Sequence, residues 1–216
     1  MLSGSPTKYA VALFSGFQAL DVFGPLDALN ILSASTPLDL YILSTTLSPV
    51  STIPVKDPIP GFIGQSVVPT HTYQDAPSDI EVLLVPGGQG TRDPELTQPV
   101  VDFVASSFPK LRYLLTVCTG SALAARAGVL DGRNATSNKL AFDWVMSNGP
   151  NVNWIRHARW VQDGNIWTSS GVSAGIDMIY AFIADQYGQE LADGIATISE
   201  YSRSTDPTND PFSGPA

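Results

Sequence analysis

The chain has 216 residues, of which 44% are hydrophobic and 14% charged, a globular composition that predicts one domain with a sizeable core. The formal net charge of -9 argues against nucleic acid and anionic membrane surfaces as partners, because both attract basic patches. The single cysteine excludes an internal disulfide framework and a cysteine-rich zinc site.

The first part of the chain alternates apolar runs with a helical pattern. "YAVALF" (9–14) is continuously apolar, which is typical of a strand covered on both faces. "DVFGPLDALNILSAS" (21–35) carries apolar residues at helical spacing, with Pro25 near its start. "LDLYILST" (38–45) predicts a second strand, and the segment 46–64 predicts a loop because it is rich in Pro, Ser and Gly.

The middle of the chain repeats this alternation around the cysteine. "IEVLLVPGG" (80–88) predicts a third buried strand that stops at a double glycine, and "PELTQPVVDFVASSF" (94–108) predicts a helix. "LRYLLTV" (111–117) predicts a fourth strand. A turn at Cys118 then leads into a helix over 120–127.

The last part combines a hairpin with helices. "KLAFDWVMSN" (139–148) predicts a short helix, and "RHARWVQDGNIWTSS" (156–170) predicts a hairpin because Asp163-Gly164 supplies turn residues between alternating side chains. Helices are predicted over 174–188 and 189–202.

Buried strands that alternate with helices predict an α/β three-layer sandwich around a mostly parallel sheet. We expect a single domain over 1–204. The segment 205–216 contains three prolines and is expected to be a loosely ordered tail. In parallel sheets ligands bind beyond the carboxyl ends of the strands. The segment 15–21, the pair Gly87-Gly88 and Cys118 all fall at such ends.

Cys118 is a candidate nucleophile because a thiol reacts as its thiolate, which a helix N-terminus favours. Thr119, Gly120 and Ser121 are small, so a tight turn would expose the sulfur and aim backbone N–H groups at developing negative charge. Thr116 stands where the G-x-S-x-G elbow has its first glycine, so that pattern matches only in part. The local pattern leaves a nucleophile and an inert buried thiol equally open.

No histidine is well placed to act as a base for this cysteine. His71 lies in a turn-like stretch and His157 at the start of the hairpin, so both are interpreted as surface or structural residues. Asp21 is the acid at the proposed edge. The residues alone favour it as a helix N-cap over a proton-exchanging partner of Cys118. The Gly87-Gly88 pair is interpreted as a strand-ending turn that allows close backbone approach, not as a nucleotide site.

The motifs together resemble the DJ-1/PfpI superfamily, which is class I glutamine amidotransferase-like, and within it the isonitrile hydratase (isocyanide hydratase)-like branch. They are "LDVFGPLDAL", "EVLLVPGGQGTRD", "VCTGSALAARAGVLDGRNATSN" and "RWVQDGNIWTSSGVSAGIDM", in the expected order between Tyr9 and Tyr201. The resemblance implies a flavodoxin-like sandwich with a nucleophile-elbow cysteine. It also implies a homodimer with neither a metal nor an organic cofactor.

The resemblance also implies roles for individual residues. Cys118 matches the elbow cysteine and Asp21 its acidic partner. Gly88, with Gly87 beside it, and Thr119 match the positions that bind substrate in an oxyanion-hole-like pocket. Asn138 stands where many members have a histidine, and it is expected to line the pocket. Asp177 matches a motif that we interpret as structural.

The implied activity is cysteine-dependent hydration of isonitriles to N-substituted formamides through a thioimidate, a lyase reaction on a small molecule. Two alternatives stay open: a glyoxalase-like enzyme acting on 2-oxoaldehydes, and a non-catalytic cysteine redox sensor or stress protein. A ligand-sensing domain of a transcription factor is less favoured, because the chain is acidic and leaves little room after Tyr201. The N-terminal stretch lacks signal-peptide features, so a cytoplasmic protein without nucleic-acid or membrane partners is expected.

Overall fold

A mostly parallel sheet forms the centre of the molecule. The computed structural model describes residues 4–56, 58 and 60–214. Seven strands build the central sheet in these described residues: β1 (Lys8–Ala12), β2 (Asp39–Ser44), β5 (His71–Thr72), β6 (Val82–Val85), β7 (Tyr113–Thr116), β10 (Trp160–Asp163) and β11 (Ile166–Ser169). Their order is β10-β11-β7-β6-β1-β2-β5, and every neighbouring pair is parallel except β10 with β11.

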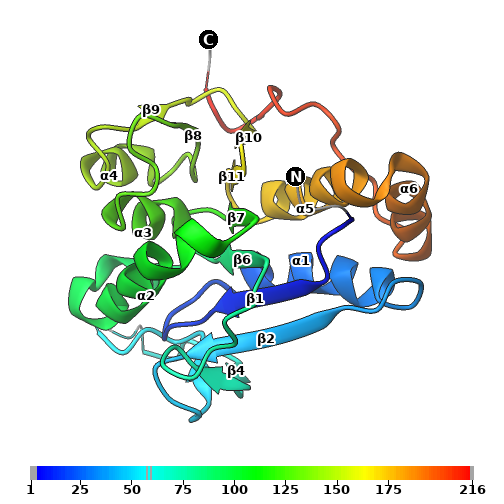
Figure 1. The fold of residues 1–216 in the computed structure, drawn as a ribbon. Coiled ribbons are helices and arrows are strands. Elements are labelled where there is room, and N and C mark those ends of the chain that lie inside the picture. Colours follow the sequence, from blue (N-terminus) through cyan, green and yellow to red (C-terminus); the bar gives the residue numbers. More distant parts are fainter. Residues whose placement is uncertain (1–3, 57, 59, 215–216) are drawn as a thin grey trace.

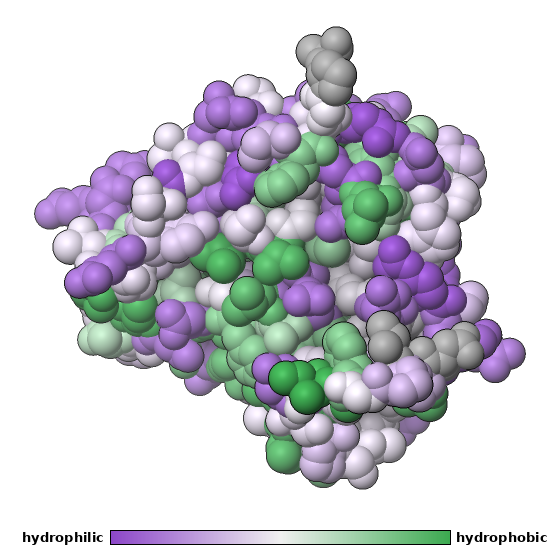
Figure 2. All heavy atoms as spheres, turned by 180° about the vertical axis from the view of Figure 1, so that it is seen from behind, coloured by the Kyte–Doolittle hydropathy of each residue, from purple (hydrophilic) through white to green (hydrophobic). Residues whose placement is uncertain are grey.

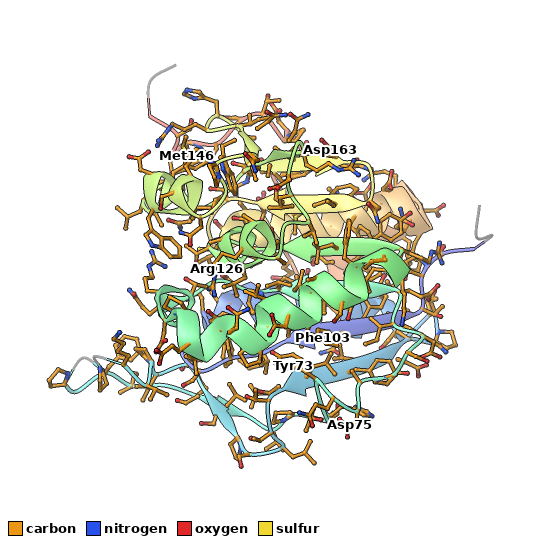
Figure 3. All side chains as sticks on the ribbon, turned by 60° about the vertical axis from the view of Figure 1, so that its left-hand side comes forward. Tyr73, Asp75, Phe103, Arg126, Met146 and Asp163 are labelled. Atoms are coloured by element: carbon orange, nitrogen blue, oxygen red, sulfur yellow. The ribbon has the colours of Figure 1, made fainter. Side chains whose placement is uncertain are left out.

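Helices cover both faces of this sheet (Figure 1). One face carries α1 (Ala19–Leu32), α5 (Ser173–Tyr187) and α6 (Gln189–Ile198), which pack on one another, and the other carries α2 (Pro94–Ser107) and α3 (Gly120–Arg126), with α4 (Phe142–Ser147) beyond α3. Figure 3 shows α2 in front of the sheet, where Phe103 packs on Tyr73 with ring centroids 5.1 Å apart. The predicted α/β three-layer sandwich is confirmed. None of the described helices has both the length and the apolar character that crossing a bilayer requires.

The core lies where the continuous apolar runs were expected to be covered on both sides. Val11 and Ala12 of β1, Leu83 of β6 and Leu114 of β7 have no exposed surface. Strands buried on both faces need apolar side chains on both sides, which is why these runs do not alternate with polar residues.

Short strands account for most differences from the expected elements. The segment predicted as a loop contains β3 (Val50–Ser51), which pairs with β4 (Ser66–Val67), and His71 belongs to the edge strand β5. β8 (Asn134–Ala135) and β9 (Asn153–Trp154) form a second small ladder. Two-residue strands are too short to produce a hydrophobic period, so the sequence gives no signal for them.

The C-terminal segment is bound to the domain over its described part, 205–214. The carbonyl of Pro207 accepts hydrogen bonds from the N–H groups of Arg159 (2.7 Å) and Trp160 (3.3 Å). Asp210 is buried and pairs with the buried ammonium of Lys139 at 3.4 Å. The prediction of a loosely ordered tail is therefore wrong for this part, because a buried ion pair and backbone bonds fix it.

Candidate active site

Cys118 lies in a tight turn between β7 and α3. Its φ of 57° is in the left-handed region, which costs a non-glycine residue roughly 1–3 kcal/mol. Surrounding bonds hold this conformation: the Cys118 N–H donates to the carbonyl of Ser170 (3.0 Å), and its carbonyl accepts from the hydroxyls of Ser121 (3.1 Å) and Ser137 (2.9 Å). The strand-to-helix turn predicted at this cysteine is present.

Two glycines let neighbouring backbone approach this turn. A Cβ on Gly120 would lie 2.2 Å from the carbonyl oxygen of Val85, and a Cβ on Gly87 would lie 2.6 Å from the Thr119 nitrogen. Both distances are shorter than any real Cβ contact, so the end of β6 packs against the turn only because these positions have no side chain.

Asp21 is fully buried in the first turn of α1. Its Oδ2 accepts a hydrogen bond from the Gly87 N–H at 2.9 Å, whereas no nitrogen or oxygen donor among the described residues reaches Oδ1. The N-cap of α1 is Gln18, so the cap interpretation of Asp21 is wrong. The carboxyl instead joins α1 to the turn after β6 and lies beside the Cys118 thiol.

The thiol and the carboxyl share a low-dielectric environment. Burial raises the pKa of Asp21 from its ordinary 3.8 to about 7, although hydrogen bonds from Gly87 and the Cys118 thiol act to lower it. Burial, and then the negative charge of Asp21, raises the pKa of Cys118 to about 12. The low thiol pKa expected from the helix N-terminus is therefore not found, because burial dominates. Near neutral pH the thiol therefore keeps its proton, and the carboxyl is the group of the pair that titrates.

Thr119 is a second polar neighbour of the sulfur, beside Asp21. Its N–H and hydroxyl, together with the charge of Arg92, act to lower the Cys118 pKa and so favour the thiolate. Its hydroxyl oxygen accepts from the Gly88 N–H at 3.0 Å and from the Thr91 hydroxyl at 3.1 Å. The Gly88 N–H, which is expected to bind substrate, thus donates to the Thr119 hydroxyl in this structure.

The remaining candidate residues lie around this centre or away from it. Asn138 lines a cavity of about 280 Å³ with Gly171 and Val172, and its Oδ1 accepts from the Ala141 N–H at 3.1 Å. Neither histidine is bonded to the pair. His71 contacts the Thr70 hydroxyl and His157 that of Ser213, as expected for surface or structural residues.

Asp177 holds the stretch of chain directly after α6 in place. It is buried and pairs with Arg159, and it accepts hydrogen bonds from the Tyr201 hydroxyl (3.0 Å) and the Ser204 N–H (2.9 Å). These bonds join α5, the hairpin and the chain after α6, which agrees with a structural role.

Sequence reasoning missed Arg92. It ends the 3₁₀ helix η1 (Gln89–Arg92), its guanidinium lies 4.3 Å from the ring centroid of Trp144, and its Nη1 donates to the Thr91 hydroxyl at 3.1 Å. The one signal in the sequence was its position four residues after Gly88. The stacking on Trp144 could not be predicted, because the two residues are far apart in the sequence. In the part of the chain that the structure describes, no three His, Cys, Asp or Glu side chains gather as metal ligands would.

Comparison with known proteins identifies relatives over most of the chain. A family model described as the DJ-1/PfpI family matches residues 7–185. The isonitrile hydratase of Pseudomonas putida is 32% identical over 192 residues, which are 88% of this chain and 76% of that protein. The HTH-type transcriptional regulator GbdR of Pseudomonas aeruginosa is 26% identical over 92% of this chain, which spans about half (52%) of that regulator.

The fold has solved counterparts. The crystal structure of a THiJ/PfpI family protein from Pseudomonas syringae superposes with a TM-score of 0.78 at 28% identity, covering 93% of this chain and 77% of that one. The sequence comparison and the structural comparison therefore identify relatives in the same family.

Proposed function

The chain belongs to the DJ-1/PfpI family, and on that basis we propose that it is a cysteine-dependent hydratase that converts isonitriles to N-substituted formamides. The observation that carries the proposal is the pairing of the Cys118 thiol with the buried Asp21 carboxyl, whose pKa is raised to about 7. The 32% identity to an isonitrile hydratase supports this activity over others in the family.

The first step joins sulfur to carbon. The Asp21 carboxylate takes the proton of the Cys118 thiol, and the thiolate attacks the terminal carbon of the isonitrile R–N≡C. Asp21 then delivers the same proton to that carbon, which gives the thioimidate R–N=CH–S–Cys118. An acid with a pKa near the working pH suits a proton that must be both taken and returned.

The second step adds water. Asp21 accepts a proton from a water molecule as its oxygen attacks the thioimidate carbon, and the proton passes to the nitrogen. The tetrahedral adduct R–NH–CH(OH)–S–Cys118 loses its C–S bond, while the hydroxyl proton returns to sulfur. One isonitrile and one water give one formamide R–NH–CHO and the free thiol. The Thr119 N–H and hydroxyl stabilise the thiolate in both steps.

A panel of isonitriles and 2-oxoaldehydes tests the proposal. We expect formamide from the wild type and from Asp185→Asn, a control carboxyl exposed on α5, and at least about 100-fold less from Cys118→Ala and Asp21→Asn. Equal formamide from the wild type and Cys118→Ala would overturn the proposal. Cys118-dependent lactate from methylglyoxal, without formamide, would replace it with the glyoxalase-like activity.

Two observations weigh against a redox sensor. The Cys118 residue is only 8% exposed, and burial raises the pKa of its thiol to about 12. Peroxide oxidises exposed cysteines with thiolate character most readily. Mild peroxide should therefore leave Cys118 largely unoxidised in intact-mass spectra.

The similarity to a transcriptional regulator supports a second candidate, in which this fold binds a small molecule without converting it. A strained cysteine beside a buried acid is not needed for binding alone, so the site favours the hydratase. Tight binding of a panel compound to wild type and Cys118→Ala alike, with no product, would favour the sensor.

We propose further that the protein is a homodimer that associates through α1. Leu20 and Phe23 of this helix are 50% and 40% exposed and lie beside Ile176 in one shallow depression. Figure 2 shows apolar side chains gathered on the face that carries α1. Light scattering after size exclusion should give twice the chain mass for the wild type and the monomer mass for Phe23→Glu.

A further inference from the structure

A second cavity, separate from the one at Asn138, lies beside the candidate active site. It has a volume of about 450 Å³, enough for a small molecule. One wall is the segment 54–56 after β3, and the other is formed by η1 and the start of α2, with Gly90, Arg92 and Asp93.

The cavity is positively charged in an acidic protein. Within the described residues, seven of the eleven Lys and Arg side chains form ion pairs with carboxylates. Of the other four, Lys56 and Arg92 line this cavity, whereas Lys110 and Arg126 do not. The one acid in its lining, Asp93, is already engaged: its Oδ1 accepts from the N–H groups of Glu95 and Leu96 at 3.1 Å and caps α2.

The exposed side chain of Arg92 lines this cavity and is oriented by two contacts. Its guanidinium stacks 4.3 Å from the Trp144 ring centroid, and Nη1 donates to the Thr91 hydroxyl. No protein acceptor among the described residues binds its Nη2 or Nε. A stacked, planar guanidinium with free N–H groups is suited to a two-point hydrogen bond with a carboxylate.

A short chain of contacts connects Arg92 to the reacting thiol. The Thr91 hydroxyl, which accepts from Arg92, donates to the Thr119 hydroxyl at 3.1 Å, and Thr119 is the neighbour of Cys118. The charge of Arg92 acts on the Cys118 pKa directly. A small molecule whose reactive carbon reaches Cys118 would thus carry its other end close to Arg92.

We propose that Arg92, assisted by Lys56, binds a carboxylate of the substrate, so that the isonitriles converted by this protein carry an anionic group. The inference rests on the proposed hydratase function and adds the substrate class. Neutral isonitriles would react with the same chemistry but bind more weakly, because they leave the guanidinium without its anion.

The test compares 3-isocyanopropanoate with its methyl ester, which lacks the negative charge and carries one additional methyl group. The wild type should show a KM for the acid about 10- to 100-fold below that for the ester, the size expected for one charged hydrogen-bonded pair. Arg92→Gln should raise the KM of the acid by that factor and change the KM of the ester less than about twofold. Arg92→Lys should recover part of the difference. Lys56→Gln should have a smaller effect, and Lys110→Gln, a cation away from the cavity, none.

The comparison between substrates separates binding from reactivity. Arg92→Gln also removes a charge that favours the thiolate, so kcat should fall equally for both compounds while only the KM values diverge. Equal KM changes for acid and ester, or no preference in the wild type, would overturn the inference.

A binding measurement keeps this result independent of turnover. Titration calorimetry with 3-formamidopropanoate, the expected product, should show binding to Cys118→Ala that is lost in the Cys118→Ala/Arg92→Gln double variant. Carboxylate-dependent binding without hydration of any isonitrile would refute the hydratase function and retain the anion site. Hydration of both compounds without carboxylate-dependent binding would do the reverse.

Discussion

The buried carboxyl of Asp21 should contribute less to the stability of the folded protein at neutral and alkaline pH than at acidic pH. Its pKa is raised in the folded state, from 3.8 to about 7, so its contribution to stability is fully present below pH 4 and is lost as pH rises through about 7. At 1.36 kcal/mol per pKa unit, the raised pKa lowers the free energy of unfolding, relative to its value at acidic pH, by about 4 kcal/mol at pH 8 and by about 2 kcal/mol at pH 5.

Asp21→Asn removes this cost because the amide stays neutral. The asparagine carbonyl can still accept the Gly87 N–H, and its NH₂ group would face the thiol sulfur, a weak acceptor. The stability of the variant relative to the wild type should therefore increase by about 2–3 kcal/mol between pH 5 and pH 8. For a chain of this size that corresponds to a rise in relative Tm of about 5–10 °C.

Urea unfolding at a series of pH values measures this difference, with calorimetry as a second readout. Asp185→Asn, which changes an exposed carboxyl on α5, is the control and should track the wild type at every pH. A difference between Asp21→Asn and wild type that does not change with pH would refute the raised pKa, and with it the assignment of the proton carrier.

Three further outcomes follow from the site and its supports. The wild-type kcat/KM for an isonitrile should rise about tenfold per pH unit up to about pH 7 and then level off, because the thiol–carboxyl pair must lose one proton before it reacts. A kcat/KM that declines as pH rises through 7 would contradict this. Gly120→Ala should lower the free energy of unfolding by about 3 kcal/mol or more and abolish activity. Gly194→Ala, at an open helical position, should change the free energy of unfolding by less than about 1 kcal/mol and the activity by less than about twofold. Urea titration measures the first quantity and the formamide assay the second. Asp210→Asn should destabilise the fold by roughly 2–4 kcal/mol, because it leaves the buried Lys139 without its counter-charge. Thermal unfolding measures the change against Asp206→Asn, an exposed control. Equal stability of the two variants would show that the buried ion pair of the C-terminal segment contributes nothing.

Much of the fold could be predicted because parallel strands leave a strong local pattern. Runs such as 9–14 and 111–117 are apolar on both sides, so their burial can be read without knowing what covers them. The hairpin around Asp163-Gly164 was equally visible from its turn residues and alternation. Short strands such as β3 and β8 left no comparable trace.

The sequence predicted which residues lie at the candidate site, but not the hydrogen bonds and pKa values of those residues. Strand ends placed Asp21 and Cys118 at one edge, but nothing local to Asp21 shows that its carboxyl accepts from Gly87 and does not cap its own helix. Likewise, the helix N-terminus predicted a lowered thiol pKa, whereas the surrounding burial, which depends on the whole fold, raises it. Long-range packing sets both properties.

The prolines of the C-terminal segment led to a wrong prediction for the same reason. The segment 205–214 is polar and rich in proline, which is typical of a loose arm. Its anchors, Asp210 and the carbonyl of Pro207, bind Lys139 and Arg159 from distant parts of the chain. No short-range pattern encodes such partners.

The most direct test of the proposed chemistry is a rapid-quench experiment that follows the wild type by intact mass after mixing with a ¹³C-labelled isonitrile. The mechanism predicts a transient adduct of one isonitrile mass on Cys118, which decays at the rate at which formamide appears and is absent from Cys118→Ala. Formamide produced without this adduct, or no formamide and no adduct, would contradict a reaction that passes through a thioimidate on Cys118.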